Sequence, residues 1–156
     1  MLIWRIIISA VALSALAFGA DQPIEFPHNK HIALNLECLD CHSQADVADA
    51  ATIPSIKKCM LCHEKIATDQ PEVQKLAAFA EAGREPPWVR IYQFNRTGHV
   101  KFRHSPHIRA DIECIACHGN MAEAVTAQPL VKHTMGTCLN CHREKQASVD
   151  CVACHI

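Results

Sequence analysis

The sequence predicts a small, mostly irregular fold with short α-helices and little sheet, and three observations lead to it. Aromatic residues make up only 5% of the 156 residues, and a chain this short and this poor in large apolar side chains usually needs disulfides, metals or cofactors. All ten cysteines fall in C-x-x-C pairs. Two segments are near copies of each other, FPHNKHIALNLECLDCH from Phe26 and FRHSPHIRADIECIACH from Phe102. A repeated, cysteine-bearing unit of this kind favours a core built from cofactors.

The first twenty residues, MLIWRIIISAVALSALAFGA, have the layout of an export signal: one early charge, an apolar run and then small residues. Ala15-Leu16-Ala17 is the best cleavage site. An uncleaved anchor is the alternative, because the apolar stretch approaches spanning length. Both interpretations place residues from about Asp21 onward outside the cytoplasm. We therefore expect a periplasmic protein, with anchoring to the inner membrane as the alternative.

The net charge of the chain does not indicate any particular class of binding partner. The 15 Lys and Arg residues nearly balance the 16 Asp and Glu residues. No basic stripe suggests binding to nucleic acid.

Every C-x-x-C pair is followed at once by histidine. C-x-x-C-H is the pattern of covalent c-type haem attachment, in which the two thiols bond to the porphyrin and the histidine binds its iron. The sequence therefore predicts five covalently bound haem c groups with their iron. The predicted attachment cysteines and proximal histidines are Cys38, Cys41 and His42; Cys59, Cys62 and His63; Cys114, Cys117 and His118; Cys138, Cys141 and His142; and Cys151, Cys154 and His155.

Three other uses of paired cysteines compete with haem. Zinc ribbons also carry paired C-x-x-C motifs, and disulfides are permitted in an exported protein, but neither requires histidine after all five pairs. Thioredoxin-like redox pairs need a βαβ setting, and none is visible. Haem attachment is the interpretation that uses every histidine of the five motifs.

Six histidines remain once the five proximal ones are set aside. The second axial ligand decides what a haem can do: an open position binds small ligands, whereas a second histidine confines the haem mainly to electron transfer. Five irons need five distal ligands, so the supply is sufficient. The candidates are His28, His31, His99, His104, His107 and His133. The repeat supports four of them, because His28 and His31 stand in the same F-x-H-x-x-H frame as His104 and His107.

The F-x-H-x-x-H segment followed by C-x-x-C-H motifs resembles the class III multihaem cytochromes c, which are small periplasmic carriers with bis-histidine haems. The match is closest from Val100 to His155, which looks like a complete three-haem member. Residues 26–63 look like a truncated two-haem copy. The resemblance implies the axial pairs His104–His118, His107–His142 and His133–His155, and in the first copy His28–His42 and His31–His63.

Two residues complicate this ligand set. Met135 is an alternative to His133, because methionine also serves as an axial ligand. His99 is left over, and we expect a structural or solvated role for it. Met60, within the second motif, and the rings of Phe26 and Phe102 are expected to pack against porphyrin.

The sequence predicts four segments: a signal peptide or anchor at 1–20, a two-haem module at 21–66, a helical and extended connector at 67–98, and a three-haem module at 99–156. One helix is expected from Thr68 or Asp69 to Gly83, with Pro71 in its first turn. Its apolar stripe should pack across both haem modules. A short helix is expected over residues 43–52, and a short strand or extended segment over 88–94.

The leading functional hypothesis is a periplasmic electron-transfer protein with five mainly bis-histidine haems and no substrate chemistry of its own, hence not an enzyme. Its partners would be redox proteins of the periplasm. The run PPWVRIYQFNRTGHVKFRHSPHI also resembles multihaem subunits of quinol-oxidising membrane assemblies such as alternative complex III. This resemblance implies the alternative, a membrane-anchored five-haem subunit of a quinol-oxidising respiratory complex. A multihaem reductase with one open haem is a third hypothesis, which the surplus of histidines disfavours.

Overall fold

The computed structural model describes residues 21–155, so the predicted export signal or anchor lies outside the described part. Within that part the chain consists of short helices and loops, with no strand beyond one antiparallel bridge between Val100 and His155. None of the described helices is long and apolar enough to span a bilayer. The predicted fold class is therefore confirmed.

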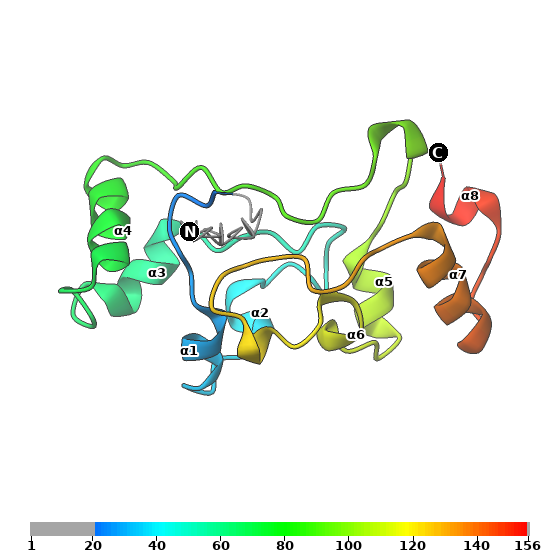
Figure 1. Cartoon of the computed structure of the whole chain (residues 1–156), viewed down its shortest axis with the longest axis horizontal. Coiled ribbons are helices and arrows are strands. Elements are labelled where there is room, and N and C mark those ends of the chain that lie inside the picture. The colour runs from blue at the N-terminus through cyan, green and yellow to red at the C-terminus, as the bar shows by residue number, and fades with distance from the viewer. Residues whose placement is uncertain (1–20, 156) are drawn as a thin grey trace, which may run out of the picture.

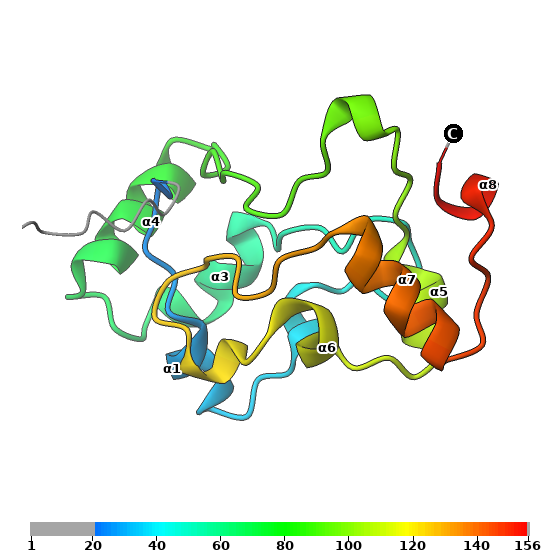
Figure 2. The same ribbon diagram turned by 45° about the vertical axis from the view of Figure 1, so that its right-hand side comes forward.

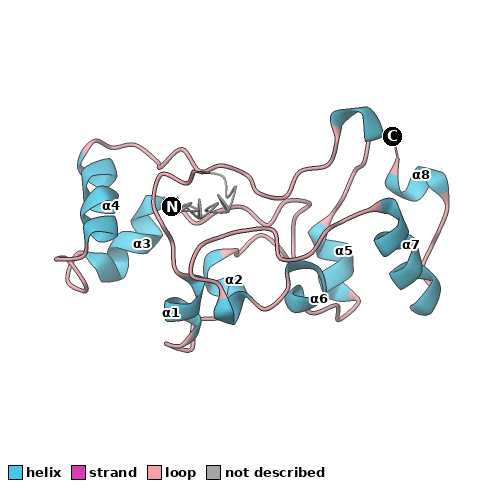
Figure 3. Cartoon of the chain, viewed as in Figure 1, coloured by secondary structure: helices cyan, strands magenta, loops and turns pink. Residues whose placement is uncertain are grey.

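The helices are spread along an elongated molecule (Figure 1). α3 and α4 lie at one end, α7 and α8 at the other, and α1, α2, α5 and α6 between them. Loops join these short helices throughout (Figure 3). In chain order the elements are α1 His28–Ile32, α2 Cys38–Cys41, α3 Ile56–His63, α4 Pro71–Glu81, η1 Arg96–Gly98, α5 His104–Arg109, α6 Cys114–His118, η2 Met121–Glu123, α7 Met135–Glu144 and α8 Cys151–Cys154.

The side-chain core is small. Ile24, Ile56 and Leu76 form one buried cluster, and Cys59, Met60, Phe79, Ala80 and Trp88 pack against it. No side chain in the described residues is less than 2% exposed, whereas Leu61 and Val152 are 76% and 84% exposed. A protein of this length normally buries most of its large apolar side chains. These side chains alone do not form the core of the fold.

The predicted connector helix is confirmed as α4. Pro71 occupies its first turn, and Gly83 follows its end with φ +62°. The Gly83 N–H donates to Ala80 O and the Arg84 N–H to Phe79 O, at 3.0 Å each, which is the Schellman pattern of helix termination. Gln70, rather than Thr68 or Asp69, precedes the first turn, with no side-chain cap.

The packing partner of α4 differs from the expectation. Its predicted stripe faces inward, with Leu76 buried and Val73, Ala77 and Ala80 half-buried. The stripe lies against α3 and the buried cluster at one end of the molecule. α4 thus supports the helix of the second cysteine motif and does not cross both modules.

The short helix expected over residues 43–52 is absent, and this prediction is wrong. Backbone carbonyls that a helix would use internally accept hydrogen bonds from elsewhere. Asp49 O accepts from the His104 N–H at 3.0 Å, and Ala48 O from the Ser105 N–H at 3.3 Å. Residues 88–94 form no strand and run as an extended connector, which the prediction allowed.

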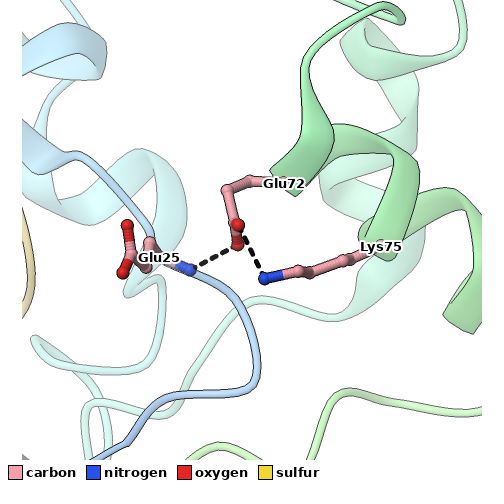
Figure 4. Close-up of polar contacts among 3 residues, drawn as sticks. All are labelled: Glu25, Glu72 and Lys75. Carbon is pink, nitrogen blue, oxygen red and sulfur yellow. Dashed lines mark hydrogen bonds and ion pairs between the residues drawn. The ribbon is translucent and has the colours of Figure 1, made fainter.

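Contacts between distant segments hold this loop-rich chain together. Glu72, in the first turn of α4, accepts hydrogen bonds from the Glu25 N–H at 2.8 Å and the Lys75 ammonium at 2.7 Å (Figure 4). The Asn29 N–H of α1 donates to Ala124 O, just after η2, at 3.1 Å. Figure 2 shows α1 beside η2, so the first repeat packs directly on the chain that follows α6.

Candidate functional site

The repeated histidine segment adopts the same structure twice. α1 begins at His28 and α5 at His104, and each carries its second histidine three residues later, on the same face of the helix. Phe26 meets His28 edge-on at 4.8 Å and stacks on His31 at 4.3 Å. Phe102 meets His104 edge-on at 4.9 Å and lies over His107 at 4.7 Å. The sequence repeat is therefore a structural repeat, in which one phenylalanine positions two imidazoles.

Most of the candidate iron ligands have one ring nitrogen bonded to the backbone. Metal-binding histidines usually donate their other N–H to a carbonyl or carboxylate, which fixes the tautomer and the ring orientation. Here Nδ1 lies 2.5–3.1 Å from a backbone carbonyl and leaves Nε2 for a metal in seven histidines: His31, His42, His63, His104, His107, His142 and His155.

Each C-x-x-C-H motif forms or ends a helical turn. The motifs lie in α2, α3, α6, α7 and α8. Residues three and four apart share one face of a helix. Both thiols and the histidine of a motif are thus presented together, as attachment to one porphyrin edge and its iron requires.

Three of the implied pairs of imidazoles have the separation of axial ligands. Metal–nitrogen bonds to histidine are about 2 Å long and the nitrogen lies about 1 Å from its ring centre, so two imidazoles on opposite sides of one ion have centres about 6 Å apart. The ring centres of His31 and His63 are 6.1 Å apart, those of His104 and His118 6.3 Å, and those of His107 and His142 6.0 Å. Each pair joins a distal candidate to the proximal histidine that the sequence resemblance implied.

The two histidines of the fourth implied pair, His28 and His42, lie close enough to each other for His42 to lower the pKa of His28. Burial first, and then the nearby His42 and His31, lower the pKa of His28 to about 4. Its Nδ1 atom is buried without a hydrogen-bond partner. Burial, followed by His104, His133 and His42, also lowers the pKa of His118. Both shifts favour the neutral imidazole, which is the form that binds a metal.

The fifth implied pair is not brought together. His133 Nε2 lies 2.7 Å from Cys117 O, and its ring stacks on Tyr92 at 4.6 Å. Its centre is 6.3 Å from that of His118, with the rings at 81°. His155 instead contacts the segment around Gly98, whose carbonyl lies 2.7 Å from His155 Nδ1. His133 therefore lies at the third motif.

The comparisons with known proteins agree with this geometry. A model of the class III cytochrome c family matches residues 7–87, about half of the chain. The chain belongs to this family. The match covers the first repeat and its two motifs, whereas the sequence resemblance was closest from Val100 to His155. Class III cytochromes c carry covalently attached haem c and transfer electrons, and both properties apply to this chain.

A curated relative is the menaquinone reductase, multiheme cytochrome c subunit, of Nitratidesulfovibrio vulgaris. It is 32% identical over 100 residues, which are 63% of this chain and 46% of the relative. The chain thus spans about half the length of the curated relative that it matches.

The residues of this class III cytochrome c fit haem better than the competing uses of paired cysteine. None of the ten cysteines, all within the described residues, forms a disulfide. The same part of the chain holds no cluster of three Cys, His, Asp or Glu side chains arranged for a metal ion, as a zinc site needs. Leu61 and Val152, which lie within the second and fifth motifs, are exposed apolar side chains that attached porphyrins would help to cover. The observed donor set is paired thiols with opposed imidazoles.

The thiols of this cytochrome show which motifs are neighbours. Burial and the adjacent Cys114 raise the pKa of the Cys38 thiol, so the first and third motifs meet. Burial and Cys41 raise the pKa of Cys59, which places the second motif beside the first. Burial, Cys141 and Cys138 raise the pKa of Cys117, so the third and fourth motifs are also neighbours. The order in space is second, first, third and fourth.

Sequence reasoning missed the role of Tyr92. Its ring stacks on His133 and meets His118 edge-on at 5.0 Å, and its hydroxyl accepts from the Val131 N–H at 3.3 Å. Tyr92 is the chain's single tyrosine, and nothing in the sequence indicated that it contacts these two histidines. The carbonyls of Asp49 and Thr52, which orient His104 and His42, were missed for the same reason.

Proposed function

We propose that this class III cytochrome c is an exported protein with five haems that relays electrons within a quinone-linked membrane complex. The observation that supports it best is the set of three opposed imidazole pairs at 6.0–6.3 Å. Two histidines on one iron confine a haem mainly to electron transfer. In this proposal the chain has no substrate chemistry of its own, and the quinone site lies on another subunit.

The proposed attachment sites are the ten cysteines of the five motifs. Their proximal ligands would be His42, His63, His118, His142 and His155. The proposed distal ligands are His28, His31, His104 and His107, paired with His42, His63, His118 and His142 respectively. For the last haem, His133 as distal ligand stays a prediction.

Covalently bound haem supplies one-electron redox chemistry, and the protein supplies binding, orientation and electrostatics. In this chain Phe26 and Phe102 would position the distal imidazoles of their own segments. Backbone carbonyls at Nδ1 would fix the tautomers of these rings. Neighbouring cysteine motifs would place successive redox groups close to each other along the length of the molecule.

The link to quinone rests on the relative. Its name places that protein in a menaquinone reductase. The sequence resemblance to alternative complex III pointed to quinol oxidation, which runs in the opposite direction. We therefore propose a link to the quinone pool with no assigned direction of electron flow.

A soluble periplasmic carrier is the second candidate. Its family favours it, because the sequence resembles small periplasmic carriers. The two candidates differ in where the protein is found after gentle extraction: a complex subunit co-purifies with integral membrane proteins, whereas a carrier is released with the periplasmic fraction. Recovery of the untagged cytochrome from the periplasmic fraction as a free monomer would overturn the proposed complex and leave the carrier.

A further inference from the structure

The fifth motif is held by a different part of the chain from the one that the family pattern implies. His155 Nδ1 lies 2.7 Å from Gly98 O, and the Lys101 N–H donates to Cys154 O at 2.8 Å. Val100 and His155 form the antiparallel bridge. The segment 98–101 thus fixes the orientation of the proximal imidazole and leaves its Nε2 for iron.

His133 is bonded to the third cysteine motif and not to the fifth. Its Nε2, the nitrogen that the other candidate ligands leave free, is bonded to Cys117 O at 2.7 Å. Tyr92 stacks on its ring at an interplanar angle of 19°. His118 already faces His104, with the two rings nearly parallel at 6°. His133 therefore acts as a positioning residue for the third motif.

The remaining histidine, His99, belongs to the segment that bonds the other nitrogen of the fifth proximal imidazole. It adjoins Gly98, whose carbonyl bonds Nδ1 of the proximal ring, and Nδ1 lies away from the iron-binding Nε2. The His99 side chain is exposed, and its backbone is left-handed at φ 47°. Its segment lies beside Nδ1 of the proximal imidazole, on the side of the ring opposite the iron-binding Nε2.

We propose that the haem on Cys151 and Cys154 has an open sixth position, which binds a small external ligand of the class of carbon monoxide, cyanide or imidazole. This inference rests on the proposed attachment of five haems. An iron with one histidine ligand is high-spin and accessible to such ligands, in contrast to the bis-histidine haems. The chain thus combines four closed redox sites with one ligand-binding site at its C-terminal end.

The test uses the intact five-haem protein, with covalent haems counted by intact mass. We expect a high-spin electron paramagnetic resonance signal from one haem in five, and one carbon monoxide bound per chain after reduction. The Cys151→Ala, Cys154→Ala double variant should keep four haems and bind none. His107→Ala, which removes a proposed distal ligand, should raise the number bound from one to two, and His31→Ala does the same at another haem if that variant fails to mature.

Any other result of these experiments would contradict either the open fifth haem or the proposed function. Five low-spin haems and no carbon monoxide binding would overturn the inference and leave the proposed function intact. If His133→Gln or Met135→Leu then created one binding site, that residue would be identified as the distal ligand. Binding that persists in the four-haem variant would place the open iron elsewhere and also overturn the inference. A wild-type chain with fewer than five haems would contradict the proposed function itself.

Discussion

Phe26 and Phe102 occupy equivalent places between two histidines, and this arrangement was only partly visible in the sequence. The F-x-H-x-x-H frame showed that the residues repeat, and it did not show that each ring contacts the two imidazoles of its own segment. The expected packing of both rings against porphyrin stays a prediction. A pattern of residue types cannot show which neighbouring side chains an aromatic ring contacts.

Phe102→Leu should loosen the imidazoles of His104 and His107 while keeping most of the side-chain volume. The ring's contacts with the two imidazoles, of about 0.5–1.5 kcal/mol each, are lost together with its contact to Phe94, so we expect a stability loss of about 1–3 kcal/mol. The g-values of two low-spin haems should also shift in the electron paramagnetic resonance spectrum. Phe79→Leu, in the separate buried cluster, is the matched control. Unchanged g-values in Phe102→Leu would show that the ring does not position these ligands.

At the scale of single ligands, the sequence predicted a set of histidines and the family resemblance predicted their pairing. Three of the pairs lie at axial spacing. His133 does not follow the pattern, because Tyr92 and Cys117 O hold it at the third motif. Both contacts come from segments remote from His133 in the chain, so spacing around the motifs could not have indicated them.

The connector helix α4 is the element that the sequence described best, because proline, glycine and apolar periodicity act locally. Its packing partner depends on the path of the chain before and after it, and there the prediction failed. The missing helix at residues 43–52 has a similar origin: its carbonyls bond to His42, His104 and Ser105. Tertiary hydrogen bonds outweighed a weak local preference.

Leu76→Ala should destabilise the end of the molecule that carries the second cysteine motif. Leu76 is only 7% exposed and packs with Ile24 and Ile56. Truncating a buried leucine costs about 2–5 kcal/mol, and we expect the lower half of that range because the cluster is small. Thermal unfolding followed by far-ultraviolet circular dichroism measures the loss. The exposed Gln74→Ala on the same helix should leave the transition nearly unchanged, and equal effects of the two variants would contradict the packing of α4 on α3.

Gly83→Ala tests how α4 ends. An alanine Cβ at this position meets nothing within 4 Å, so strain at φ +62° is the main cost. Left-handed backbone costs an L-residue about 1–2 kcal/mol, and the free energy of unfolding should fall by about 1 kcal/mol. Gly83→Asn should recover part of this loss, since asparagine tolerates the left-handed region. An alanine variant as stable as the wild type would show that the helix does not need this termination.

Across the whole molecule, the two repeats meet through the first motif of each. Cys38 and Cys114 are neighbours, and His104 bonds to the loop that follows the first motif. Chain order would place the second motif, and not the first, next to the third. Sequence alone could not predict this, because it depends on how the loop at 43–52 folds back on α5.

Removing the first haem by Cys38→Ala and Cys41→Ala should therefore shift the reduction potential of the third haem more than that of the fourth. Interactions between charged groups weaken with distance, and the first and third attachment sites are adjacent. A potentiometric titration that resolves individual haems by their nuclear magnetic resonance methyl signals gives the comparison. Removal of the fifth haem is the control and should leave the potential of the first haem unchanged. A larger shift at the fourth haem than at the third would contradict the proposed order.

In our proposal, one short chain carries five covalently bound haems in place of a side-chain core. The decisive measurement is the intact mass of the protein, purified from a host that matures c-type cytochromes. We predict the mass of the exported polypeptide plus five haem groups, unchanged by denaturation and reduction because the thioether bonds are covalent. A mass equal to the bare polypeptide, or an increment of fewer than five haems, would show that the chain does not carry five covalent haems.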